Sequence, residues 1–340
     1  MRRVFGWVVG AVVLLGGGRL DAQARQAFQV GTIDFFGGQG MDTAALLPKL
    51  PVRVGQPVKM EQVEQLQPAI SAAVLTATGK ATTDVNVVCC DQPGKVQLYV
   101  GLQGGSYRAA SYAAAPTGDA TLPEDGVVLY RNISKANEQA VESGHAQEDD
   151  SNGYALSSVP AMHAIEVKMR AYALKHAGAI EDVLRGSKDA EERQAAAMLL
   201  GYAERSDEQV KDLALAAGDA NSDVRNNAVR ALVVLAAAQP LVGLEVKPFV
   251  GMLYSGSWTD RNKASFLLFR ITQARDPAVL KTLRDEAMGP LRDGARWQSA
   301  GHAFPFLMIL GRIGGIDEVR LQKLIDSGAR DEIIAAAEKH

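Results

Sequence analysis

The sequence predicts a multidomain protein in which a small α+β unit precedes an all-α, right-handed solenoid of helix pairs. The first observation is an arginine that recurs at spacings of 32, 36 and 35 residues and opens an apolar run each time, at Arg193, Arg225, Arg261 and Arg296. The second is a pattern of strands and helices confined to residues 28–102. A period of this size is typical of solenoids, whose units bury their apolar faces only by stacking on their neighbours.

The composition indicates a folded protein and excludes one class of partner. Of the 340 residues, 47% are hydrophobic and 22% are charged, which is typical of a globular chain. The formal net charge of −3 leaves no surplus of positive charge to neutralise phosphates. Nucleic acid is therefore not expected as the main partner.

Residues 1–24 have the three parts of a cleavable export signal. Arg2 and Arg3 supply the positive start, Val4–Leu15 the apolar segment, and Ala22–Ala24 an A-x-A cleavage site. The apolar segment is shorter than the roughly 20 residues that span a bilayer. We therefore expect a periplasmic or secreted bacterial protein that does not span the membrane once the signal is cleaved.

Residues 25–105 are expected to form the small α+β domain. Strand composition, turn residues and helix-ending residues define elements in the order strand, helix, helix, strand, strand. These elements are Phe28–Phe35, Thr43–Leu50, Met60–Ala77, Val85–Cys90 and Lys95–Leu102. Pro51 ends the first helix and Gly79 the second, because proline disfavours a helical residue before it and glycine accepts the left-handed conformation.

This element order, the start Ile33-x-Phe35-x-Gly37 and Gly55 between the two helices resemble a POTRA module. POTRA domains are periplasmic units associated with outer-membrane assembly and secretion. The resemblance implies binding by addition of a partner strand to the sheet edge, where main-chain hydrogen bonds supply the affinity. An unrelated α+β sandwich with the same element order is the alternative.

Cys89 and Cys90, the only cysteines of the chain, are adjacent on a predicted strand. Three interpretations stay open. Both can be small apolar strand residues, since cysteine packs like a small hydrophobe. A bond between them would close a strained ring, distort the strand and could act as a redox or contact element. One thiol could instead pair with another chain in an oxidising compartment.

Residues 106–158 are expected to form a linker or capping segment. Pro123–Ile133 is predicted as a short strand or turn, and Ala136–Glu142 as one short helix. An acidic cluster follows at Glu148, Asp149 and Asp150, and Gly153 ends it. Oxygen-rich loops of this kind can hold calcium, although the spacing of a calcium-binding EF-hand loop is missing here. A solvated linker is the alternative.

Residues 159–340 are predicted to be helical throughout, as about five pairs of helices. The pairs are Met162–Lys175 with Ala179–Leu184, Ala190–Ala203 with Glu208–Ala217, Asp223–Ala238 with Pro248–Tyr254, Arg261–Ala274 with Pro277–Ala287, and Arg296–Ile313 with Val319–Ile325, closed by Asp331–Lys339. In the third pair, one apolar stripe at helical spacing is predicted as core; it comprises Val224, Ala228, Ala231, Leu232 and Leu235.

Three motifs carry a resemblance to HEAT repeats, and more narrowly to the short bacterial kind seen beside bilin-lyase-like repeats. They are Asp223-Val224-Arg225-x-x-Ala228-x-x-Ala231-Leu232, Arg193-x-x-Ala196-x-x-Leu199-Leu200-Gly201 and Leu310-Gly311-x-Ile313-Gly314. The resemblance implies that aspartate–arginine pairs form a structural ladder between successive repeats. Its members would be Arg193, Arg225, Arg261, Arg296, Asp219 and Asp223. A row of anion-binding sites at the helix N-termini is the alternative.

The last pair departs from the repeat pattern at two positions. Ser299 stands where the other repeats have alanine, and Pro305 interrupts the predicted first helix. Because proline removes a hydrogen bond inside a helix, a kink is expected there.

The sequence predicts a binding protein and not an enzyme. None of the five histidines forms a metalloprotease motif, and no nucleophile elbow occurs. No cofactor is expected, and a bilin-lyase-like activity is the only enzymatic function that the family resemblance offers. We predict an exported protein–protein interaction scaffold or adaptor, associated with unidentified envelope proteins and binding through the solenoid and by strand addition. The alternative is a calcium- or small-ligand-responsive module that uses Glu148–Gly153 as a switch.

Overall fold

The computed structural model describes residues 28–92, 94–142 and 148–339. Contacts divide them into two compact units. We call residues 28–110, 253–261 and 280–339 the sheet unit, and residues 111–252 and 262–279 the helical unit. The predicted export signal, 1–24, lies outside the described residues. Within the described ranges, no helix combines the length and the apolar character needed to cross a membrane.

The N-terminal part of the sheet unit is a small mixed sheet, as predicted. Its strands are β1 (Phe28–Phe36), β2 (Pro57–Val58), β3 (Val85–Gln92) and β4 (Lys95–Gly101), in the order β2-β1-β4-β3. β4 pairs in parallel with β1 and antiparallel with β3. The parallel pair is possible because a helix connects β1 back to the hairpin of β3 and β4.

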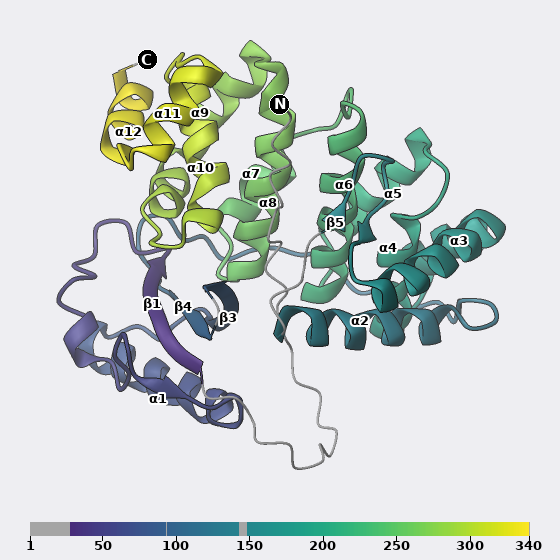
Figure 1. The fold of residues 1–340 in the computed structure, drawn as a ribbon, viewed down its shortest axis with the longest axis horizontal. Helices are drawn as coiled ribbons and strands as arrows, with labels where there is room; N and C mark the ends of the chain where they lie inside the picture. The colour runs from purple at the N-terminus through teal and green to yellow at the C-terminus, as the bar shows by residue number, and fades with distance from the viewer. Residues whose placement is uncertain (1–27, 93, 143–147, 340) are drawn as a thin grey trace. The chain divides into compact units, whose positions relative to one another are not determined.

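One face of the sheet packs on α1 (Met60–Thr78), which lies along it in Figure 1. Val30, Leu98 and Val100 of the strands form a core with Ile70 and Val74 of the helix. α1 ends where predicted, because Gly79 takes the left-handed conformation with φ 74° and its N–H bonds to the carbonyl of Leu75.

The predicted helix Thr43–Leu50 is wrong. The structure has only a short 3-10 helix, Leu47–Lys49, and Leu50 after it is extended with ψ 148°. Pro48 lacks a backbone donor and Pro51 disfavours a helical Leu50, so the segment cannot continue beyond this turn.

The other face of the sheet packs on segments from the end of the chain. Trp297 Nε1 donates to the carbonyl of Phe35 at 3.1 Å, and the backbone N–H of Gln298 donates to the Asp34 carboxylate at 3.1 Å. β4 is consequently buried along almost its whole length, as expected for a strand covered on both faces. The sheet and the last helices thus form one compact unit, and not the separate domains 25–105 and 159–340 that the sequence predicts.

The C-terminal helices of the sheet unit have different bounds from those predicted. They are α9 (Pro277–Ala295, from Leu280 in this unit), α10 (Ala300–Ile313), α11 (Glu318–Asp326) and α12 (Arg330–Lys339), and α10 packs on both α11 and α12. α10 continues through Pro305, so the proline lies inside the helix and does not end it. Ser299 differs from the repeat because it is the N-cap of α10, where its hydroxyl accepts from the N–H of His302 at 3.3 Å.

The helical unit is an array of packed helices, compatible with the predicted α-solenoid. Its helices are α2 (Gly126–Glu142), α3 (Pro160–Gly186), α4 (Ala190–Leu200), α5 (Asp207–Ala216), α6 (Ser222–Ala238), α7 (Lys247–Leu253) and α8 (Trp258–Ile271), and α7 and α8 cross its bounds at 252 and 262. α4 packs on α3 and α6, and α6 packs on α5. A short 3-10 helix, Thr272–Ala274, follows α8.

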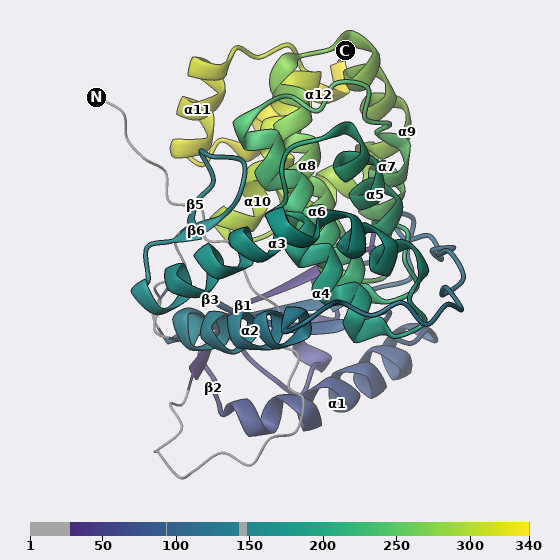
Figure 2. The same cartoon turned by 90° about the vertical axis from the view of Figure 1, so that its right-hand side faces the viewer.

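One prediction within this unit needs correction. Pro123–Ile133 is mostly helix α2 and not a strand or turn; α2 lies against α3 and α4 in Figure 2 and buries Ile133. The β-branched Val127-Val128 pair favours a strand locally, but packing overrides that preference. The predicted helices Met162–Lys175 and Ala179–Leu184 both lie within α3, and the predicted break between them is confirmed as a kink at the non-helical residue His176 (φ −122°, ψ 19°).

Candidate functional site

Three of the four repeating arginines share one geometry. Arg193, Arg225 and Arg261 each donate to the backbone carbonyl six residues earlier, at 2.9, 2.9 and 2.6 Å. All three are buried. Each guanidinium therefore stabilises the loop that leads into its own helix, which is a structural task.

Asp219 connects two successive helices of the array. Its carboxylate accepts from Nε of Arg193 on α4 at 2.7 Å and from Nη2 of the same residue at 3.0 Å. Its carbonyl accepts from Nη1 of Arg225 on α6 at 2.9 Å. This arrangement is the kind of rung that the HEAT resemblance implies.

Two residues of the predicted ladder have other surroundings. Asp223 accepts from Gln194 at 3.5 Å and, within the described ranges, forms no ion pair. Burial raises the pKa of Asp223, and the nearby Arg225 opposes the rise. Arg296 lies exposed in the turn between α9 and α10, so it does not occupy the ladder position. The equivalent position, four residues after the N-cap Ser299, is the buried Ala303.

The acidic cluster lies beside arginines. Glu148, at the start of the two-residue strand β5 (Glu148–Asp149), forms an ion pair with Arg230 of α6. Asp150 pairs with Arg270 of α8 at 3.0 Å. Asp149 is exposed and accepts from the N–H of Ser151 at 2.9 Å. No group of three or more potential metal ligands forms among the described residues, and the paired carboxylates do not favour calcium.

The same ion pairs border a pocket between the acidic segment, α6 and α8. It is lined by Glu148, Asp150, Arg230, Val233, Val234, Lys263, Phe266, Phe269 and Arg270, and its cavity volume is about 40 Å³. A cavity of this size has room for about three water molecules. We call it the Lys263 pocket.

Lys263 is the unusual residue of this pocket. Only 4% of its surface is exposed, and among the described residues its ammonium donates to no acceptor. Burial, together with the positive charge of Arg230, lowers the pKa of Lys263 to about 7, against the opposing effect of Glu148. A buried lysine without a partner costs stability, so it is a candidate functional residue.

The pKa values of the two pocket arginines, Arg230 and Arg270, shift in opposite directions. Burial disfavours the charge of Arg230, but the negative charge of Glu148, with a smaller effect of Glu166, holds the pKa of that guanidinium above its ordinary value. For Arg270 burial prevails and lowers the pKa, with Asp150 in opposition. The ion pair with Glu148 therefore anchors Arg230 on one side of the pocket.

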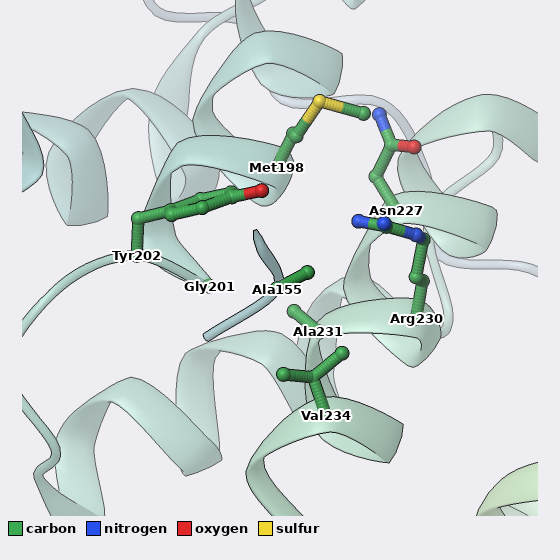
Figure 3. Close-up of a pocket in the computed structure, with 8 residues that line it drawn as sticks. All are labelled: Ala155, Met198, Gly201, Tyr202, Asn227, Arg230, Ala231 and Val234. Carbon is green, nitrogen blue, oxygen red and sulfur yellow. The ribbon is translucent and has the colours of Figure 1, made fainter. Parts of the chain in front are cut away.

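A second, smaller cavity adjoins Arg230 on the α4 side. It is lined by Ala155, Met198, Gly201, Tyr202, Asn227, Arg230, Ala231 and Val234, and its volume of about 10 Å³ fits at most one water. Figure 3 shows the Tyr202 hydroxyl and the Arg230 guanidinium pointing toward one another across it. Gly201 is required here, because a Cβ at this position would lie 2.9 Å from Cβ of Ala231.

Several residues that line the two cavities lie at two positions of the repeat where the residue type changes from one repeat to the next. Two residues after each ladder arginine stand Ala195, Asn227 and Lys263, all buried. Five residues after the first two ladder arginines stand Met198 and Arg230, which line the smaller cavity. The sequence signal for this site is a lysine at a position where the two preceding repeats have asparagine and alanine.

Cys89 is disulfide-bonded, so its interpretation as a free apolar side chain is wrong. The pairing of β3 with β4 shifts register between Cys89 and Gln92, which is the local distortion expected if the cysteine is constrained. The Cys90 side chain lies outside the described residues.

The sheet unit contains a buried aromatic cluster that the sequence analysis missed. The Tyr99 hydroxyl lies 2.7 Å from Nδ1 of His302, and the Tyr99 ring stacks on Trp258 at 4.8 Å between centroids. Trp297 meets Tyr99 edge-on at 5.1 Å. Next to it, burial raises the pKa of Asp34 to about 6 against its hydrogen bonds from Gln298. These side chains hold the sheet against the C-terminal segments.

Comparison of the chain with known protein families and with curated proteins finds no match. The resemblances to HEAT repeats and to a POTRA module therefore depend on the residues quoted for them, and they stay predictions.

Proposed function

We propose that the chain is an exported protein–protein interaction scaffold and not an enzyme. The observation that supports it is the internal use of the repeating arginines. Arg193 and Arg225 both bond to Asp219, which ties α4 to α6. Because these contacts are buried and charge-assisted, they fix the helices of the array relative to one another. In a stiff array, the exposed faces of the second helix of each pair are held at fixed positions. Such faces can form a binding surface.

The second helix α5 carries such a face. Leu215 is 63% exposed, and Lys211 and Glu208 precede it at helical spacing with exposed side chains. A partner would bury the leucine and contact the charges at its rim, which is the usual anatomy of an interface. Strand addition to the N-terminal sheet is the second contact in this proposal, and envelope proteins are the expected partners.

A capture experiment tests the proposal. The mature chain is immobilised and incubated with envelope extract, and each stoichiometric protein captured is purified and titrated against the chain in solution. Leu215→Asp should weaken that binding at least tenfold. Val242→Asp, at a loop position that is 95% exposed, should leave it unchanged. Absence of any stoichiometric partner, or equal affinities for the two variants, would contradict the scaffold.

Export is tested separately. Residues 1–24 are fused to a reporter enzyme that matures only outside the cytoplasm, and Ala24→Leu serves as a variant with a damaged cleavage site. We expect reporter activity with the native segment and an uncleaved product with the variant. An inactive reporter with the native segment would overturn the predicted localisation.

The calcium form of the alternative function has little support, since Glu148 and Asp150 pair with arginines. The other version of this alternative, binding of a small ligand, would use the Lys263 pocket.

A further inference from the structure

The charges that line the Lys263 pocket do not balance. Among the described lining residues, three side chains are basic and two are acidic. The Glu148 carboxylate is taken by Arg230, and that of Asp150 by Arg270. Lys263 is left with its ammonium at the cavity and with no acceptor among the described residues. A negative group that entered the pocket would provide the missing partner and offset the cost of burying the amine.

The rest of the lining is apolar. Val233 and Val234 come from α6, and Phe266 and Phe269 come from α8. Apolar walls with a few convergent polar groups are the usual composition of a small-molecule site. The cavity volume of about 40 Å³ admits a small head group only. The remainder of a ligand would therefore lie along the apolar side chains at the mouth.

We propose that the Lys263 pocket binds the carboxylate of a small organic monoanion, whose apolar body packs on Phe266 and Phe269. The carboxylate accepts hydrogen bonds from the Lys263 ammonium, and Arg230 and Arg270 flank it. This site is independent of the scaffold proposal, because its residues lie on α6, α8 and the acidic segment, whereas Leu215 lies on α5.

The charge count selects the class of ligand. A surplus of one positive charge is neutralised by a monoanion, whereas a dianion such as phosphate would leave an uncompensated charge beside Glu148 and Asp150. A cation would face Lys263 and is excluded by repulsion. A neutral molecule of the same shape would fill the apolar mouth but would leave the buried amine unpaired.

Calorimetric titration of the full mature chain tests the proposal, with hexanoate and benzoate as probes. Hexan-1-ol and inorganic phosphate are the matched controls for charge and for the apolar body. We expect saturable binding of at least one carboxylate, with an affinity at least tenfold above that of either control. Lack of carboxylate binding at millimolar concentration, or equal binding of hexanol or phosphate, would overturn the proposal.

Two variants locate the site. Lys263→Met keeps the length of the side chain and removes its charge, so carboxylate binding should fall at least tenfold. Lys281→Met is the control, because it removes a lysine whose side chain is 71% exposed. This variant should bind the carboxylate with the affinity of the native chain. Equal binding by Lys263→Met and the native chain would place the carboxylate elsewhere.

A measurement on the native chain avoids any dependence on the folding of a variant. A lysine with a lowered pKa reacts readily with acylating reagents near neutral pH. Hexanoate should slow the acetylation of Lys263, followed by peptide mass spectrometry, and should leave the rate at Lys281 unchanged. An unchanged rate at Lys263 under saturating hexanoate would contradict the proposed contact.

Discussion

Nε of Arg193 lies 2.7 Å from Oδ2 of Asp219, and both side chains are buried. The same aspartate accepts through its carbonyl from Arg225. The repeating arginines thus hold α4 and α6 together through Asp219. Lys263 lies two residues after Arg261, at a position whose residue type differs from repeat to repeat. Such a position is available for a function that the other repeats do not share.

Arg193→Met should lower the free energy of unfolding by about 3–5 kcal/mol, because it leaves the Asp219 carboxylate buried without its partner. Arg131→Met is the matched control. Its ion pair with Glu191 is exposed, at 62% and 42%, so the loss should stay below about 1 kcal/mol. Urea denaturation of both variants measures the difference. Similar small losses would show that the ladder does not stabilise the array.

Tyr99→Phe should lower the free energy of unfolding by about 1–3 kcal/mol, since it removes the buried hydroxyl that meets Nδ1 of His302. Tyr130→Phe is the control: that hydroxyl bonds Gln194 at 3.1 Å in a less buried position, and about 1 kcal/mol or less is expected. Thermal or urea denaturation decides. A larger effect at Tyr130 would mean that the aromatic cluster contributes little.

Asp34 should make stability fall as pH rises from about 4 to about 6. Its folded pKa is about 6 against an ordinary 3.8, so in this interval the folded state binds more protons than the unfolded state. The stabilisation is complete below the ordinary pKa and is lost through the folded pKa. The shift corresponds to about 2–3 kcal/mol. Asp34→Asn should remove this slope; identical pH profiles for variant and native chain would contradict the assignment.

Lys263 should act at higher pH and with the opposite slope. Its folded pKa is about 7 and its ordinary value 10.5, so between these values the unfolded state binds more protons and stability rises with pH. Arg230, Arg270, Glu148 and Asp150 line the pocket around it. Relative to Lys263→Met, the native chain should gain on the order of 3–5 kcal/mol from pH 7 to 10.5. A constant difference would show that the buried amine keeps its proton over this interval and that its pKa is not lowered.

Local patterns predicted the elements that local physics determines. β1, the end of α1 at Gly79 and the helices α4 and α6 follow from strand composition, a left-handed glycine and the recurring apolar runs. The core stripe of α6, including Val224 and Leu232, is buried as its spacing predicts.

Features that depend on distant residues were not accessible in this way. The sequence spacing aligns Arg296 with the ladder, but α9 extends to Ala295 and α10 begins only at Ala300, beside Trp297, which bonds to β1. Likewise, the acidic cluster suggests a calcium loop until its partners Arg230 and Arg270 are known. The Lys263 pocket joins residues more than a hundred positions apart, and no local rule connects them.

The most direct test compares Asp219→Asn with Lys263→Met in one calorimetric series with hexanoate, at a temperature where circular dichroism shows both variants folded. If repeating residues hold the array and Lys263 binds the anion, Asp219→Asn should bind hexanoate within about twofold of the native chain while Lys263→Met binds at least tenfold more weakly. Equal loss in the two variants, or a loss confined to Asp219→Asn, would contradict this division of roles.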